Sequence, residues 1–296
     1  MRSIRRKILL LILISVTLLQ AGVFHVPFKT VSNLIIVQAK VNGFSENFIF
    51  DTGAKTLIIN RQYIEAYEKG SEKKYELRGI GSKVLKVEDV NVSAFEFADI
   101  QKKDFKAIVL EMSLIQEVVG QPVYGLIGYE IFKGYDVLID YQESFLTFIP
   151  YDEFMFYWNN NIINQKFTLL DFFLSDHLPV IKALAGDKRI TLGIDTGAAR
   201  TLIDLKTIDK ISYEIDDVKK QQLVGIDNQN LMITSGVITR LKIGDLNFNK
   251  MEILIQDISH INDFISTRVD GLIGYNILKN YRTLISYSNK KIVLVE

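Results

Sequence analysis

The chain has 296 residues, 48% hydrophobic and 24% charged, which allows about two ordinary domains and disfavours disordered, collagen-like and coiled-coil proteins. Lysine plus arginine and aspartate plus glutamate each number 35, and this balance argues against a nucleic-acid partner. The absence of cysteine excludes disulfides, thiolate metal sites and cysteine nucleophiles, and the histidines are too far apart for a short metal motif: His25, His177 and His260. We expect no metal or organic cofactor, and chemistry that rests on carboxylates or hydroxyls.

Residues 1–21 have the pattern of an export signal. Four basic residues within the first seven positions precede an apolar run over residues 8–19, which is shorter than the roughly 20 residues that span a membrane. Leu19 and Ala21 fit a cleavage site, although less well than two alanines would. We expect a periplasmic, extracellular or envelope-anchored protein, with membrane contact only if the segment stays uncleaved. The alternative, that residues 8–19 form a helix packed on the folded protein, is disfavoured because such a helix would have no polar face to present to solvent.

The rest of the sequence repeats itself. Residues 34–58 align with 178–203 over a shared DTGA string, which places Asp51 on Asp195 at an offset of 144. Later, YGLIGYEIFKGY and DGLIGYNILKNY match at an offset of 146. Two copies of a long unit indicate a duplicated domain, because solenoid units are shorter and more numerous.

Short runs rich in Ile, Val, Leu and Phe predict strands throughout both units. Tight hairpin turns are expected at Asn42-Gly43 and Gly186-Asp187. The few predicted helices lie at residues 61–67, near 205–211 and after each GLIG. The sequence therefore predicts an all-β protein with few short helices, in which each unit is a small barrel.

In this prediction three segments follow residues 1–21. The first lobe spans residues 30–150, the connection 151–176 and the second lobe 177–296. A turn is expected in the connection at Asn159–Asn161. The aromatic side chains just before this turn could line a ligand groove, but packing against the lobes is the commoner fate: Phe154, Phe156, Tyr157 and Trp158.

The two D-T-G copies are the main functional signal. Asp51 and Asp195 each follow one predicted apolar strand and precede another. A Leu-Ile-Gly motif occurs later in each copy. A turn is the alternative interpretation of such an aspartate, but a turn explains poorly why the whole context is repeated. We interpret both aspartates as catalytic.

These paired motifs resemble those of the aspartic peptidase clan. The DTGA spelling and the absence of cysteine are closer to retropepsins, whereas two lobes in one chain are closer to pepsin-like enzymes. The resemblance covers residues 30–296 and implies two homologous six-stranded-type β-barrel lobes of acid-protease fold, related by a pseudo-two-fold axis. It also implies threonine hydroxyls that hydrogen-bond across the interface. The supporting loop residues are Thr52, Gly53, Ala54, Thr196, Gly197 and Ala198, and the glycines expected to allow close backbone approach beside them are Gly128 and Gly274.

Two carboxylates that share one proton can activate a water and protonate an amide carbonyl. Neither aspartate is assigned as acid or base, because the titration belongs to the pair. Ala54 and Ala198 stand where pepsin-like enzymes usually carry a hydroxyl. A hydroxyl there would stabilise the charged carboxylate, so its absence predicts a less acidic pair and a mildly acidic optimum.

Substrate-covering flaps are expected between the two motifs of each lobe, with ordinary hairpin turns as the alternative. The candidate tips are Gly79, Ile80 and Gly81 in the first lobe and Gly225 and Ile226 in the second.

Together these features predict a monomeric, exported aspartic endopeptidase that cuts extended polypeptides between its lobes. One alternative is a catalytically silent binding module on the same fold. Another is an enzyme restricted to a narrow set of cell-envelope proteins.

Overall fold

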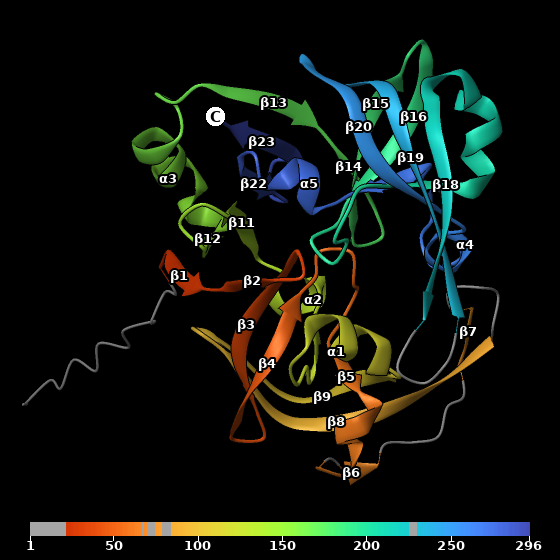
Figure 1. Ribbon diagram of the computed structural model, residues 1–296. Coiled ribbons are helices and arrows are strands. Elements are labelled where there is room, and N and C mark those ends of the chain that lie inside the picture. Colours follow the sequence, from red (N-terminus) through yellow and green to blue (C-terminus); the bar gives the residue numbers. More distant parts are fainter. Residues whose placement is uncertain (1–21, 67, 70–74, 79–83, 225–229) are drawn as a thin grey trace, which may run out of the picture.

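The computed structural model describes residues 22–66, 68–69, 75–78, 84–224 and 230–296. The described residues are mostly in strands, which form two barrels and a sheet that joins them (Figure 1). None of the helices in these ranges is long and apolar enough to cross a membrane.

The first lobe is a closed barrel. Six strands follow one another in the order β3-β4-β10-β5-β9-β8, and the ring closes because β8 also pairs with β3. The strands of this lobe are β2 (Lys29–Val31), β3 (Leu34–Val41), β4 (Phe44–Phe50), β5 (Ile58–Asn60), β6 (Glu68–Lys69), β7 (Tyr75–Arg78), β8 (Val84–Phe97), β9 (Ile100–Leu110) and β10 (Gly125–Ile127).

The second lobe repeats this topology. Its ring runs β15-β16-β21-β17-β20-β19 and closes through pairing of β19 with β15. The strands are β14 (Phe173–Ser175), β15 (Leu178–Ala185), β16 (Lys188–Ile194), β17 (Leu202–Asp204), β18 (Ile215–Val224), β19 (Asn230–Ile243), β20 (Leu246–Gln256) and β21 (Gly271–Ile273). Two homologous six-stranded barrels, as predicted, are thus confirmed.

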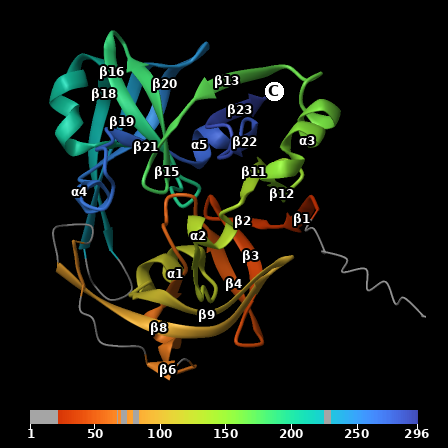
Figure 2. The same ribbon diagram turned by 180° about the vertical axis from the view of Figure 1, so that it is seen from behind.

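A third sheet joins the lobes along one side of the molecule (Figure 2). Its order is β1-β12-β11-β22-β23-β13, so each half contains equivalent strands and the centre is the antiparallel pair β11·β22. The strands are β1 (Phe24–Pro27), β11 (Tyr135–Asp140), β12 (Phe145–Pro150), β13 (Phe167–Asp171), β22 (Arg282–Ser286) and β23 (Lys291–Val295).

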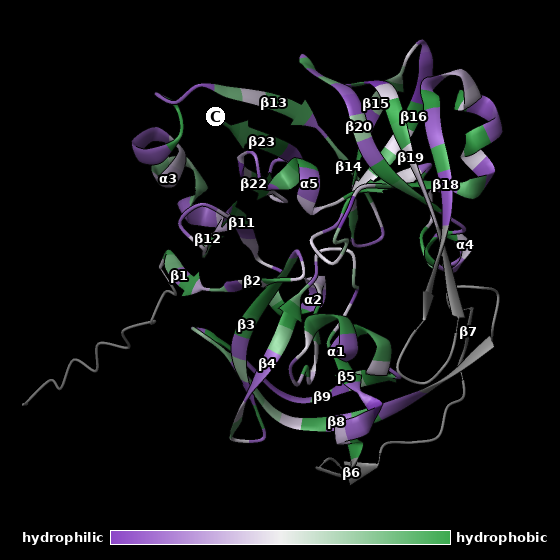
Figure 3. Ribbon diagram, in the orientation of Figure 1, coloured by the Kyte–Doolittle hydropathy of each residue, from purple (hydrophilic) through white to green (hydrophobic). Residues whose placement is uncertain are grey.

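Alternating side chains fill the barrels, and hydrophobic and hydrophilic residues are interleaved along the strands (Figure 3). In the first lobe, Phe48 of β4 packs edge-on against Phe95 of β8, with ring centroids 5.9 Å apart. Both side chains are 0% exposed. The predicted hairpin turns connect β3 to β4 and β15 to β16, where Asn42, Gly43 and Gly186 have φ of +49°, +89° and +58°.

Helices are short and lie between strands. The predicted ones are present, as 3-10 helices η1 and η3 and as α2 and α5 after each GLIG, while α1, α3 and α4 were not predicted. Their bounds are η1 (Arg61–Ala66), α1 (Ser113–Val119), α2 (Tyr129–Phe132), η2 (Tyr151–Glu153), α3 (Phe154–Asn161), η3 (Leu205–Glu214), α4 (Ser259–Asn262) and α5 (Tyr275–Leu278).

The connection differs from its prediction in two respects. The turn expected at Asn159–Asn161 is wrong, because these exposed residues are the last turn of α3. The helix forms because Phe154, Tyr157 and Trp158, at three- and four-residue spacing, pack on one apolar cluster. Packing is therefore confirmed for these three aromatics, whereas Phe156 lies on the opposite face and is 68% exposed.

Polar contacts between the lobes flank the β11·β22 pair. At one end the buried carboxylate of Asp136 accepts hydrogen bonds from Ser286 Oγ at 3.0 Å, Ser288 N at 2.9 Å and Ser288 Oγ at 2.6 Å. At the other end Asp140 lies 3.2 Å from Arg282 Nε in a more exposed ion pair. We expect the Asp136 contact to be the stronger link, because this carboxylate is fully buried and accepts three hydrogen bonds.

We therefore expect Asp136→Ala to lower the free energy of unfolding by about 1–3 kcal/mol, since it leaves buried donors unsatisfied. The matched control Asp140→Asn, at the other end of the same pair, should cost less than about 1 kcal/mol. Urea denaturation of both variants measures the difference. Equal losses would contradict the view that the buried carboxylate links the lobes.

Candidate active site

The loops that carry Asp51 and Asp195 begin where a barrel strand ends. β10 runs parallel to β4, and β21 runs parallel to β16. The last residue of each partner strand accepts the aspartate N–H, Asp51 N to Ile127 O at 3.1 Å and Asp195 N to Ile273 O at 3.0 Å. Both aspartates are 8% exposed. The apolar motif that follows each D-T-G copy thus positions the backbone of that copy's aspartate.

Thr52 and Thr196 hold the two loops against each other. Thr52 N donates to Thr196 Oγ1 at 3.0 Å, and Thr196 N donates to Thr52 Oγ1 at 3.1 Å. Each hydroxyl then donates across the interface, Thr52 to Ile194 O at 3.0 Å and Thr196 to Phe50 O at 2.8 Å. Both threonines are 0% exposed. The predicted cross-lobe hydrogen bonds are therefore present in both directions.

Gly53 and Gly197 are needed for close approach between the lobes. Neither adopts positive φ. A Cβ on Gly53 would lie 2.6 Å from Asp195 Cγ, and one on Gly197 would lie 2.5 Å from Asp51 Cγ. Each carboxylate thus packs directly on the glycine of the opposite loop, and this contact leaves no room for a side chain.

The two carboxyl groups lie close enough to shift each other's pKa, and each accepts hydrogen bonds from its own loop. Asp51 Oδ1 accepts from Gly53 N at 2.8 Å and Ala54 N at 3.0 Å, and Asp195 Oδ1 accepts from Gly197 N at 2.8 Å. Burial raises the pKa of both groups, and the adjacent Asp51 raises the pKa of Asp195 further. The geometry therefore favours a pair that retains one proton.

Gly128 and Gly274 lie beside the loops, as predicted. A Cβ on Gly128 would lie 2.4 Å from Thr56 O, and one on Gly274 would lie 2.4 Å from Ala198 O. The helices α2 and α5 start immediately afterwards, where Tyr129 N donates to Ala54 O at 2.9 Å and Tyr275 N to Ala198 O at 3.0 Å. These contacts place Ala54 and Ala198 in equivalent positions.

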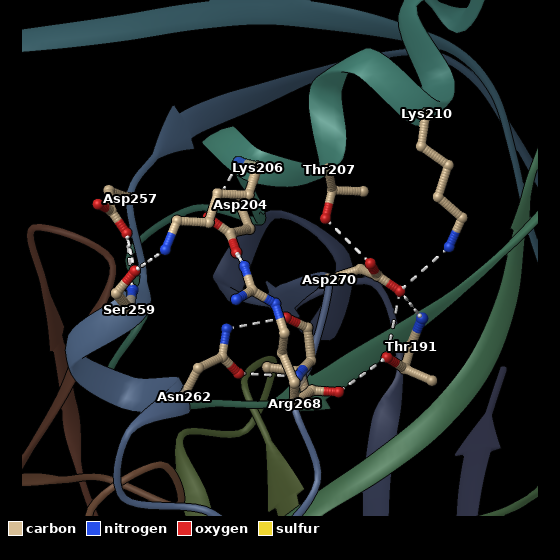
Figure 4. Close-up of polar contacts among 11 residues, drawn as sticks. Thr191, Asp204, Lys206, Thr207, Lys210, Asp257, Ser259, Asn262, Arg268 and Asp270 are labelled. Carbon is tan, nitrogen blue, oxygen red and sulfur yellow. Dashed lines mark hydrogen bonds and ion pairs between the residues drawn. The ribbon is translucent and has the colours of Figure 1, made fainter.

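A polar network anchors the strand behind the second loop (Figure 4). Asp270, just before β21, accepts from Thr191 N at 2.8 Å and Thr207 Oγ1 at 2.9 Å. Asp204, at the end of β17, is 0% exposed and pairs with Arg268. Sequence reasoning missed this network because its members are scattered along the chain. In the first lobe the position of Asp204 is occupied by Asn60, whose Nδ2 donates to Val123 O at 2.9 Å.

The sequence suggests no role for His177 beyond that of a possible metal ligand. In the structure its side chain contacts the first loop. Its Nε2 lies 2.8 Å from Gly53 O, and the side chain is 7% exposed. The available signal was its place in the repeat, directly before Leu178, where the first copy has Asn33. Among the residues that the structure describes, no group of three or more acidic or histidine side chains could hold a metal ion.

A cavity of about 600 Å³ lies beside the second loop. Asn33 of the first lobe lines one side, and Ala199, Arg200 and Glu252 of the second lobe line part of the other. Arg200 Nη1 lies 3.5 Å from Glu252 Oε2. The cavity thus lies mainly on the second lobe, next to Asn33 of the first lobe, and both polar and apolar residues line it.

The candidate flap tips lie outside the described residues, so their role stays a prediction: Gly79, Ile80, Gly81, Gly225 and Ile226. The strands that lead to them are described. The backbone of β7 reaches α4 of the second lobe, and β18 and β19 approach the same side of the molecule (Figure 1, Figure 2).

The match to a protein family agrees with this geometry. A family model described as aspartyl protease matches the chain twice, over residues 37–131 and 181–277. The chain belongs to this family. With two matches in one chain and two closed barrels, it is a retropepsin-like aspartic protease with duplicated lobes. No curated protein matches it closely.

The threonine contacts generate a stability prediction. Thr52→Ala removes the acceptor of the buried Thr196 N–H, and it should lower the free energy of unfolding by about 1–3 kcal/mol. Thr52→Ser keeps the hydroxyl and serves as the control, with a loss of no more than about 1.5 kcal/mol for the deleted methyl. Chemical denaturation measures both. The bridging role is refuted if the serine variant loses as much as the alanine variant.

Proposed function

We propose that the protein is an aspartic endopeptidase in which Asp51 and Asp195 activate one water between the lobes. The observation that carries this proposal is the contact of the two carboxyl groups across the interface. Each packs on the other loop's glycine, and the charge of Asp51 raises the pKa of Asp195. The family match supports the peptidase class.

In the proposed reaction the ionised carboxylate takes a proton from the water, and the protonated carboxyl donates to the carbonyl oxygen of the scissile amide. A tetrahedral intermediate forms, and collapse with proton transfer to the amine nitrogen releases both products. Two close carboxyl groups suit this chemistry because their mutual repulsion keeps one proton on the pair. The threonine contacts hold the geometry without taking part in proton transfer.

The proposed substrate is an extended polypeptide that lies across the interface. The cavity between Asn33 and Arg200 would accept one of its side chains. We propose that a single chain suffices, because each lobe supplies one aspartate. The residues described contain no metal cluster, and the proposed mechanism uses none. Export through residues 1–21, with retention in the envelope if they stay uncleaved, is also proposed.

A silent binding module is the second candidate. It would tolerate loss of either aspartate or its glycine, whereas this chain keeps both copies of Asp-Thr-Gly in tight mutual contact. Two buried carboxyl groups with raised pKa values cost stability, and a binding role alone does not need that cost. These observations favour the peptidase.

Activity tests the proposal directly. Asp51→Asn and Asp195→Asn should each lower kcat on unfolded casein or a peptide library by at least about 10²–10⁴-fold, because each removes a proton-transfer group. Asp171→Asn, an exposed carboxylate on β13, is the control and should leave kcat unchanged. Persistent cleavage in both site variants would refute the assignment.

The pH profile tests the role of the alanines. We expect a mildly acidic optimum, since burial raises both pKa values of the pair and no hydroxyl at Ala54 or Ala198 offsets this. In Ala54→Ser or Ala198→Ser a donated hydroxyl would stabilise the carboxylate. The pKa would fall, and the acid limb of kcat/KM should move to lower pH. A wild-type optimum as low as pepsin's, or an acid limb that moves upward in the serine variants, would contradict this account.

A further inference from the structure

Gly53 is held in place by contacts on three sides. Its N–H donates to Asp51 Oδ1 at 2.8 Å, and its Cα packs on the carboxylate of Asp195. On the third side its carbonyl oxygen lies 2.8 Å from His177 Nε2. A shift of the Gly53 backbone would therefore change the position of one carboxylate relative to the other.

The hydrogen bond to the Gly53 carbonyl determines which ring nitrogen of His177 carries the proton. A carbonyl oxygen only accepts hydrogen bonds, so Nε2 carries a proton and donates it to Gly53. The other ring nitrogen, Nδ1, is buried and has no partner within the described ranges. A ring with a buried, unpartnered Nδ1 is held in the Nε2–H form, and charging it would bury an additional unsatisfied donor.

Among the described residues, none makes an equivalent contact with the second loop. Gly197 donates to its own aspartate, and its Cα packs on Asp51, as the symmetry requires. At the position equivalent to His177, however, stands Asn33, which lines the cavity beside Ala199. No hydrogen bond joins Asn33 to the Gly197 carbonyl in the portion of the chain that the structure covers. The two halves of the pair therefore have different surroundings.

We propose, resting on the peptidase function above, that His177 is a positioning residue of the catalytic pair. It donates to the Gly53 carbonyl, fixes the Asp51 loop against Asp195 and makes the two aspartates inequivalent. It acts on the pair through the Gly53 carbonyl. The second lobe thereby holds the loop of the first lobe in place, and the described residues of the first lobe make no such contact in return.

The charges around His177 agree with this role. Asp51 and Lys55 act on the ring from the first loop, and Asp176 acts from its own turn. Burial lowers the pKa of His177 and outweighs the negative charge of Asp51, which acts in the opposite direction. The ring is therefore neutral at neutral pH. On acidification it would gain a charge that stabilises ionised Asp51.

Kinetics per competent site test the inference. Active-site titration with a tight peptide inhibitor removes any effect of misfolded protein. We expect His177→Ala to lower kcat per site by about 10- to 100-fold with KM within about twofold, because misplacement affects the reacting geometry. His177→Gln, which retains a neutral donor, should restore most of the rate, and His25→Ala on β1 should match wild type. Unchanged kcat in the alanine variant, or no rescue by glutamine, would overturn the proposal.

A second measurement does not depend on cleavage. NMR titration of the imidazole signals should show the Nε2–H form and a pKa for His177 that falls further in Asp51→Asn, since the neighbouring charge is lost. Asp171→Asn should leave this pKa unchanged. If the pKa is the same in wild type and Asp51→Asn, the coupling between His177 and the Asp51 carboxylate is refuted. If wild type does not cleave peptides but this shift is found, the peptidase proposal fails and the coupling stands.

Discussion

Four hydrogen bonds made by Thr52 and Thr196 hold loops from two lobes together, and the position of both carboxylates follows from them. Both threonines are fully buried, so each bond lost would leave a polar group unsatisfied away from water. The loops approach so closely that each aspartate packs on a glycine of the other lobe. The site therefore exists only in the assembled pair of lobes, and either barrel alone would carry half of it.

This proximity has an electrostatic cost. A carboxyl group whose pKa is raised on folding favours the folded state below its ordinary pKa, and the stabilisation is lost as pH rises through the folded value. Asp51 and Asp195 both belong to this class, so the site destabilises the fold toward neutral pH. Away from the site the lobes are joined by the six-stranded sheet, where β11 pairs with β22 and Asp136 accepts hydrogen bonds from Ser286 and Ser288.

Sequence reasoning predicted the features that the repeat encodes. The barrels, the hairpin turns and the facing loops follow from strand patterns and from two copies of D-T-G. It did not predict α1, α3 and α4, because short helices leave a weak periodic signal. It also missed His177 and the pairing of Asp204 with Arg268, which join residues distant in sequence and differ between the two copies. Such departures from internal symmetry become visible only when the lobes are brought together.

The central claim is that one chain builds one proton-sharing pair from its two lobes. Calorimetric titration with a peptide that carries a hydroxyl in place of the scissile carbonyl tests it most directly, because such a group binds between the two carboxyl groups. The account predicts one ligand per chain and a large loss of affinity in both Asp51→Asn and Asp195→Asn. Binding of one ligand per two chains, or undiminished binding in either variant, would contradict it.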